Sequence, residues 1–182
     1  MPIAPGSRRV LVPAEPVRFI TGVIMSELAT EERAKALKKA FDLLSRRDHS
    51  RSELKTKLYS RKFSGASIEH ALNECKRLNL INDHNFAIRY VAELKFKGYG
   101  IFRLREKLYR KGIGKEIIET VLADLDVDEE KKSARKSMEK KMRQLRRETD
   151  KQKKQQKLYR YLISRGFSSD TVRELMDEEL GS

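Results

Sequence analysis

Cysteine and proline are scarce in this chain, and long apolar runs are missing. Cys75 is the single cysteine, which excludes an intrachain disulfide and any metal cluster built on cysteines. All four prolines lie within the first sixteen residues, so proline interrupts no helix after that point. No apolar run approaches the roughly 20 residues of a membrane span. We therefore expect a cytoplasmic protein without a membrane anchor, free to form helices over most of its length.

Positive charge is abundant. Lysine and arginine number 41 against 27 aspartates and glutamates, which gives a net charge of +14 in 182 residues. A surface of this kind favours polyanionic partners, because each phosphate that a cation neutralises releases a condensed counterion. Nucleic acid is therefore the first partner class to consider.

Apolar residues recur at six shared positions in three copies of one pattern. The first copy contains Leu54, Leu58, Phe63, Ile68, Ala71 and Leu72. The second contains Leu104, Leu108, Ile113, Ile118, Val121 and Leu122. The third contains Leu158, Leu162, Phe167, Val172, Leu175 and Met176. Each copy has a helix stop and one apolar residue at the same offset, at Lys62-Phe63, Gly112-Ile113 and Gly166-Phe167, so each copy predicts two helices joined by a turn.

A further amphipathic helix precedes each pair, which makes the repeat a three-helix unit. Its apolar positions are Leu37, Ala40, Phe41 and Leu44 in the first unit, Phe86, Tyr90, Val91 and Leu94 in the second, and Ala134, Met138, Met142 and Leu145 in the third. We predict an all-α protein of three tandem three-helix repeats in an elongated, curved array. The predicted ranges are an irregular leader over 1–33 and repeats over 34–79, 80–126 and 127–180.

Polar residues mark where these helices begin. Ser50 with Glu53 forms a capping-box pattern, Asn82 or Asp83 can cap the second unit, and Asp128 can cap the third.

The stretch Gly98-Tyr99-Gly100 resembles a phosphate-binding loop only at first sight. The spacing of a Walker motif, with its Gly-Lys-Ser/Thr ending, is absent. We interpret the glycines as a chain reversal between two helices, and Tyr99 as a plug against a neighbouring helix rather than an exposed contact.

No arrangement of side chains points to catalysis. His49, His70 and His84 are scattered, with no pair at the spacing that places two metal ligands on one helix face. Cys75 falls in register with Ile68 and the other apolar positions of its helix, as a core thiol would. We expect no enzyme activity, no bound metal and no cofactor.

The cations are the candidate binding residues. The first group surrounds the Gly-Tyr-Gly turn and comprises Lys95, Lys97, Arg103, Lys107 and Arg110; a second group comprises Arg46, Arg47, Arg51, Lys157, Arg160 and Arg165. The third helices carry acids instead, such as Glu69 and Glu116, which argues against sequence-specific reading of DNA by a recognition helix. The run of Lys, Arg and Gln from Lys131 to Lys157 continues the first helix of the third unit and then forms a polar connector, which we interpret as a solvated, mobile segment.

Three segments resemble the RecX regulatory family of bacteria: HSRSELKTKL (49–58), INDHNFAIRYVAELKFKGYGIFRLREKLYRKGI (81–113) and KLYRYLISRGFSSDTV (157–172). The order Phe-Ala-x-x-Tyr, Lys-Gly-Tyr-Gly and a basic helix ending in Lys-Gly-Ile carries most of this resemblance. The chain departs from the family at Glu93-Leu94-Lys95-Phe96, where relatives tend to have arginines, and at Ile101, where proline is frequent.

The resemblance implies a regulator of the RecA recombinase, with a place in homologous recombination, DNA repair and the SOS response. Such a protein binds the RecA filament on single-stranded DNA and restrains filament extension, ATP hydrolysis and strand exchange; binding to double-stranded DNA stays open. We expect a monomer. The alternative hypothesis is a stand-alone, non-sequence-specific DNA- or RNA-binding scaffold that competes with a recombinase for nucleic acid.

Overall fold

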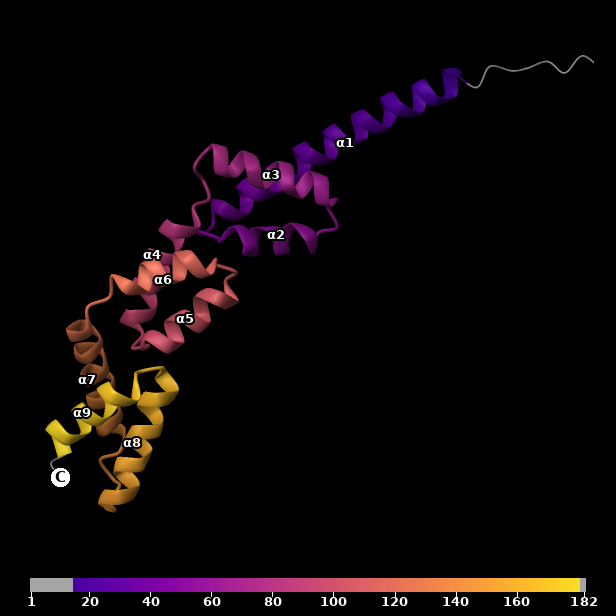
Figure 1. Cartoon of the computed structure of the whole chain (residues 1–182). Coiled ribbons are helices and arrows are strands. Elements are labelled where there is room, and N and C mark those ends of the chain that lie inside the picture. Colours follow the sequence, from indigo (N-terminus) through magenta and orange to yellow (C-terminus); the bar gives the residue numbers. More distant parts are fainter. Residues whose placement is uncertain (1–14, 181–182) are drawn as a thin grey trace, which may run out of the picture.

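The architecture is a row of three helical units. The computed structural model describes residues 15–180, with side chains described for 26–126 and 128–179, and this part of the chain forms helices and connecting turns without a strand. The helices are α1 (Glu15–Leu44), α2 (Arg51–Tyr59), α3 (Gly65–Arg77), α4 (Asp83–Phe96), α5 (Ile101–Arg110), α6 (Lys115–Ala123), α7 (Val127–Gln144), α8 (Lys151–Arg165) and α9 (Ser169–Leu180). Three successive helices make each unit. The units follow one another along an elongated, curved path, as predicted (Figure 1).

Each unit has its own hydrophobic core. The six repeating apolar positions lie in these cores, and all but Phe63 and Met176 are buried there. Cys75 is fully buried in the first core, as expected, and burial raises the pKa of its thiol. Because the three cores are separate, the turns and loops at the joints must hold the units together.

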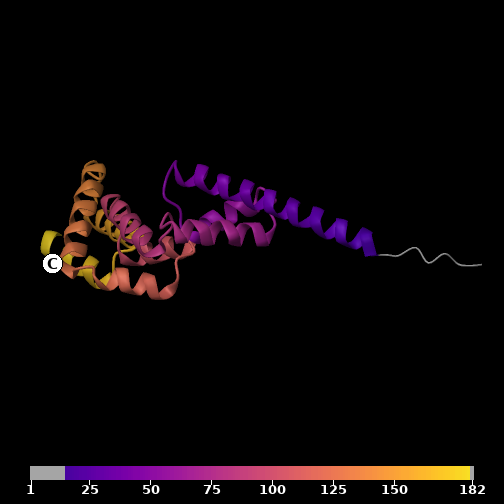
Figure 2. The same ribbon diagram turned by 90° about the horizontal axis from the view of Figure 1, so that it is seen from above.

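The predicted irregular leader is wrong for residues 15–33, since α1 begins at Glu15. Four early prolines suggested irregular structure, but Pro16 stands in the first turn of α1, where proline is tolerated because the amide it lacks would have no helical partner. Glu32 belongs to the first unit: its carboxylate accepts hydrogen bonds from the amide and hydroxyl of Ser64, the residue that caps α3. The first turns of α1 extend beyond the unit that contains it (Figures 1 and 2). The rest of the predicted leader, residues 1–14, lies outside the described residues.

The predicted helix starts are confirmed in two units and wrong in the third. Ser50 caps α2 by accepting the Glu53 amide at 3.1 Å, and Asn82 caps α4. In the third unit Asp126 caps α7 and accepts the amide of Asp128, the residue that was predicted as the cap. The basic run after Lys131 first continues α7, as predicted, but the connector predicted after that helix is shorter than expected, because α8 already begins at Lys151.

The turn after each middle helix has a residue with a left-handed backbone at the same place. These residues are Lys62, Gly112 and Gly166, with φ of 64°, 70° and 85°. A Cβ at Gly112 would come within 2.3 Å of Ser52 in the preceding unit, and one at Gly166 within 2.4 Å of the Arg103 amide. Glycine is therefore required at both positions for two reasons: the backbone has a positive φ, and the preceding unit approaches too closely for a side chain. Lys62 is exposed, and no other unit of the described residues approaches it, which leaves room for a side chain.

Candidate polyanion-binding cleft

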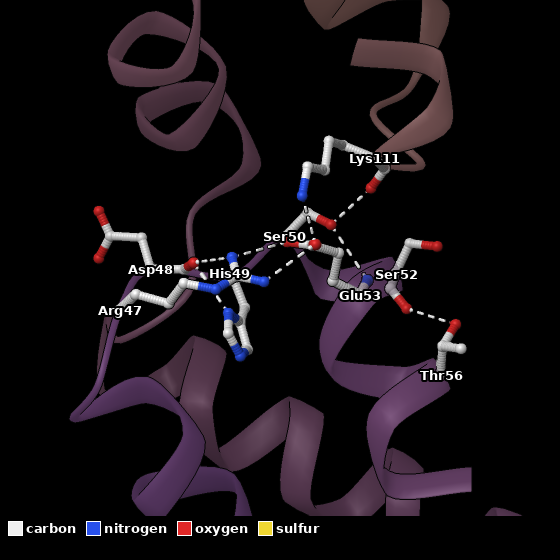
Figure 3. A network of polar contacts seen from close by, with 8 residues as sticks. All are labelled: Arg47, Asp48, His49, Ser50, Ser52, Glu53, Thr56 and Lys111. Carbon is white, nitrogen blue, oxygen red and sulfur yellow. Dashed lines mark hydrogen bonds and ion pairs between the residues drawn. The ribbon is translucent and has the colours of Figure 1, made fainter. Parts of the chain in front are cut away.

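The first and second units meet where the start of α2 contacts the end of α5, and we call this contact the first joint. A polar network holds it together (Figure 3). The Ser50 hydroxyl donates a 2.5 Å hydrogen bond to the main-chain carbonyl of Lys111. The Lys111 ammonium pairs with Glu53 at 2.5 Å, and Arg47 reaches the same carboxylate with two bonds of 3.3 Å. Glu53 thus fixes one cation from each unit.

Burial of the Glu53 carboxylate by itself would raise its pKa. The hydrogen bonds from Arg47 and Lys111 outweigh burial, and the net effect lowers the pKa below the ordinary value of 4.5. The carboxylate therefore stays ionised at neutral pH, and the network keeps its charge.

The second joint connects the second and third units, where the start of α5 contacts the end of α8. The amide of Gly100, at the start of α5, donates to the carbonyl of Arg165 at 2.9 Å, and the amide of Phe102 donates to the carbonyl of Gly166 at 3.0 Å. At both joints the carbonyl before the left-handed glycine accepts a bond from the start of the preceding middle helix. The Gly-Tyr-Gly stretch is thus a joint between helices, as interpreted from the sequence.

A cleft of about 530 Å³ lies between the loop after α1 and the helices α4 and α5. Cations outnumber carboxylates in its lining: the cations are Arg47, Arg89, Lys97, Lys107 and Lys111, and the acids are Asp48 and Glu93. The arrangement brings together three of the predicted binding residues, Arg47, Lys97 and Lys107.

Aromatic rings form part of the cleft lining. Phe86 and Tyr90 stack one helical turn apart on α4, with ring centroids 5.6 Å apart. The Lys111 ammonium lies 5.3 Å from the centroid of Tyr90, and the Lys107 ammonium lies 4.8 Å from that of Tyr99. A cation over an aromatic face keeps its charge, and the ring restricts its position. The ammonium groups of Lys107 and Lys111 are therefore held at fixed positions in the cleft.

Several cleft cations are already paired with acids. Arg89 bonds Asp48 at 2.9 Å, and Lys97 pairs with Glu93, which raises the pKa of Lys97 and lowers that of Glu93. Lys107 has no carboxylate partner among the described residues. A polyanion entering the cleft would therefore meet Lys107 as its least neutralised cation.

The other predicted residues of the first group lie outside this cleft. Glu106 bridges Arg103 and Arg110: its Oε2 lies 2.5 Å from the Arg103 guanidinium, and its Oε1 lies 2.5 Å from the Arg110 guanidinium. Lys95 turns to the opposite side of α4 and pairs with Glu129 of the third unit. The compact cation cluster predicted around the turn is therefore divided, and much of its charge is balanced internally.

The second group is divided as well. Arg51 pairs with Glu69 at 2.7 Å, and Lys157 pairs with Glu148. Arg165 lies at the second joint, where its guanidinium stands 5.0 Å from the Tyr99 ring and donates to the Lys97 carbonyl. Arg46 and Arg160 are exposed and have no ion-pair partner among the described residues.

Sequence reasoning missed Arg89 and Lys111 as cleft cations. A signal for Lys111 was present, because Arg61, Lys111 and Arg165 occupy one column of the repeat directly before the left-handed residue. Arg89 had no such signal. Its partner Asp48 comes from a loop 41 residues earlier, so only the folded joint brings them together.

Side chains suited to a metal are not grouped in the described part of the chain: no three of its His, Cys, Asp and Glu residues are placed to hold an ion. Within the described residues, no helix combines the length and apolarity needed to cross a membrane. What the cleft offers is charge and aromatic surface.

Comparisons with known proteins agree with this architecture. Family models for the three domains of RecX match here: the first three-helix domain at residues 36–75, the second at 82–122 and the third at 128–176. Regulatory protein RecX of Chlorobium phaeobacteroides is 39% identical over 146 residues, which cover 78% of this chain and 93% of that protein. Regulatory protein RecX of Prosthecochloris aestuarii is 34% identical over 154 residues, which cover 84% of this chain and 99% of that protein.

A solved structure shows the same fold. The crystal structure of RecX from Lactobacillus salivarius superposes with a TM-score of 0.72 at 26% identity and covers 82% of this chain and 97% of that one. From the three domain matches and the sequence identities, the chain belongs to the RecX family of regulatory proteins.

Proposed function

We propose that this chain regulates the RecA recombinase by binding the RecA filament on single-stranded DNA, in the cytoplasm and as a monomer. In this proposal it restrains filament extension, ATP hydrolysis and strand exchange. The observation that carries the proposal is the cleft at the first joint, which is lined by cations from two units and in which Lys107 and Lys111 lie over aromatic rings. Phosphates or an acidic protein surface are the ligands that such a lining favours.

The shape of the molecule supports a filament as the partner. An array of units in which each unit contacts only its neighbours presents an extended surface, and extended surfaces suit long, regular ligands. The cations are spread over the array, from Arg47 at the first joint to Arg165 at the second. A filament offers repeated acidic or phosphate positions over a comparable length, whereas a small ligand would use only one of the joints.

Titration of this protein into steady-state ATP hydrolysis by the cognate RecA on single-stranded DNA tests the proposal. We expect inhibition at well below one molecule per RecA, because a regulator bound in the filament stops extension beyond it. The titration is repeated with a large excess of bare DNA. Inhibition that survives the excess supports action on the filament, and an absence of inhibition would exclude the proposed activity.

The cleft is tested by Lys107→Glu. Reversing the one cleft cation that has no carboxylate partner in the described part of the chain should raise the concentration for half-inhibition by about three- to tenfold, since charges at the edge of an interface mainly affect association. Lys115→Glu is the matched control, because Lys115 is exposed on α6 and is not part of the cleft lining. Equal effects of the two variants would remove the cleft from the proposal.

A second candidate function is supported by Arg46 and Arg160, whose charges are exposed and have no ion-pair partner within residues 26–126 and 128–179. Free cations on the outside of the array suit a stand-alone nucleic-acid-binding scaffold that competes with RecA for the strand. This candidate predicts tight binding to bare polynucleotide, with a salt slope of about −0.7 for each phosphate contacted on a single strand. Inhibition of ATP hydrolysis that disappears in excess bare DNA would favour it.

A further inference from the structure

Phe96, the last residue of α4, has the most exposed large apolar side chain among the described residues, at 93% of its full surface. Single exposed apolar residues are common on protein surfaces, but a whole aromatic ring in water at a basic site is less usual. No cation or aromatic ring of the described residues lies in contact with its face. The ring is therefore available to a ligand.

Phe96 lies in a groove of about 500 Å³ between the end of α4 and α7, away from the cleft at the first joint. Lys95, Lys132 and Lys136 line the groove, with Glu129 as its acid. Lys95 and Glu129 pair with each other, so their charges largely cancel. Lys132 and Lys136 have no partner among the described residues, and they leave the groove with a net positive charge.

The unpaired lysines continue along α7. Lys132, Lys136 and Lys140 are spaced four residues apart and are all exposed, and their side chains make no ion pair or hydrogen bond within the described residues. Residues at this spacing lie on one face of a helix, about 6 Å apart along its axis. The face therefore presents a row of free ammonium groups that starts beside the Phe96 ring.

Two kinds of macromolecule could use such a groove, and the composition of its lining distinguishes them. A partner helix needs several apolar anchors along a groove, and Phe96 is the only apolar residue in this lining. A single strand of nucleic acid needs one aromatic face for a base and cations that follow its phosphates. The groove meets the second requirement and fails the first.

We propose that the Phe96 groove binds single-stranded nucleic acid, with a base stacked on the Phe96 ring and the phosphates of the same strand on Lys132, Lys136 and Lys140. The inference goes beyond the proposed function, because it assigns a strand contact outside the cleft that exists whether or not the chain acts on RecA.

The absence of tryptophan from the sequence allows a direct test. Phe96→Trp places a single tryptophan in the groove and keeps an aromatic face, so titration with oligothymidylate should quench its selectively excited emission. Tyr59→Trp is the control, because Tyr59 is a 74% exposed aromatic residue on α2 of the first unit. We expect quenching in the first variant and none in the second.

Affinity measurements on the full chain complete the test. Phe96→Leu should weaken binding of labelled oligothymidylate about ten- to a hundredfold, the range expected for loss of one base–aromatic stack. Replacing Lys132 and Lys136 by alanine should make the salt slope shallower by about 1.4, at about 0.7 per lost phosphate contact.

Three outcomes would overturn the inference. The oligonucleotide could bind without quenching the tryptophan at position 96, it could quench both tryptophan variants equally, or polyglutamate could quench as strongly as oligothymidylate. The first would place the strand elsewhere, the second would indicate non-specific contact, and the third would indicate an acidic protein partner. None of these depends on RecA, so failure here leaves the ATP hydrolysis test of the proposed function intact.

Discussion

The Ser50 hydroxyl and the Lys111 carbonyl meet at 2.5 Å although 61 residues separate them in the chain. Ser50 also caps α2 through the Glu53 amide, so one buried side chain begins a helix and fastens the next unit. The sequence around Ser50 predicts a helix cap, but it does not predict the hydrogen bond that joins the first unit to the second.

Ser50→Ala should lower the free energy of unfolding by about 1–3 kcal/mol, because it removes the cap and deprives a carbonyl of its partner. Urea denaturation followed by circular dichroism measures the change. Ser52→Ala is the control, since Ser52 is an exposed residue of the same helix and its hydroxyl makes no hydrogen bond with any described residue (Figure 3). A loss no larger than that of the control would show that the joint does not depend on this bond.

Gly112→Ala should destabilise the protein by at least about 1–2 kcal/mol, because an alanine at φ of 70° is strained and its Cβ would collide with Ser52. Lys62→Gly should have the opposite sign and stabilise by up to about 1 kcal/mol, since it relieves the same backbone strain. The measurement is again urea denaturation.

Gly65→Ala is the control for both changes, because a Cβ there has nothing within 4 Å and the site lies at the start of α3. It should be neutral or mildly stabilising, by up to about 1 kcal/mol. Equal destabilisation by Gly112→Ala and Gly65→Ala would contradict the packing that the structure gives for the joint.

Acid should weaken the first unit through His49. The ring is buried, which lowers its pKa from 6.5, and nearby Arg47 acts in the same direction, while a hydrogen bond with the Asp48 carbonyl partly opposes the shift. The unfolded chain therefore binds the proton more readily than the folded one. The contribution of His49 to stability is complete above pH 6.5 and declines as the pH falls below it.

Thermal unfolding between pH 5 and 8 measures this effect. His49→Asn, which keeps a donor near the Asp48 carbonyl, should flatten the pH dependence just below neutrality, whereas His84→Asn at an exposed site should leave it unchanged. A wild-type profile that is flat through this range would contradict the assigned role of His49.

Tyr99 should stabilise the second joint through its ring. Lys107 of the second unit and Arg165 of the third lie 4.8 and 5.0 Å from its centroid. Tyr99→Leu should cost about 1–3 kcal/mol, whereas Tyr99→Phe, which keeps the ring, should be close to wild type. Tyr109→Leu provides the control, as Tyr109 is exposed and makes no ring contact. Similar losses for leucine and phenylalanine at position 99 would show that the hydroxyl matters instead of the ring.

The cores of this protein could be predicted from its sequence, because burial follows helical periodicity and the pattern occurs three times. Leu54, Leu104 and Leu158 occupy one column and all three are buried. The prediction for Tyr99 as a plug was right in part: the ring is half-buried against the second core and also holds two cations.

The binding residues were less predictable, for an electrostatic reason. Counting charges by segment gives residues 34–125 a net charge of +10 and residues 126–182 a net charge of +4, but the count does not show which carboxylate each cation faces. Arg103 and Arg110 share Glu106, whereas Lys132 and Lys136 of the third unit pair with no described side chain. The start of α1 was missed for another reason, since proline patterns alone do not show that Pro16 occupies a tolerated first turn.

Lys62 occupies, in the first unit, the position that glycine occupies in the other two. At the two internal joints a glycine lets the start of the preceding middle helix approach within contact distance, and even one added carbon would collide. At the first unit the same position carries a lysine side chain. A side chain at this position is incompatible with the close approach seen at the internal joints, so a further helical unit packed on the first one by the same geometry would collide with Lys62.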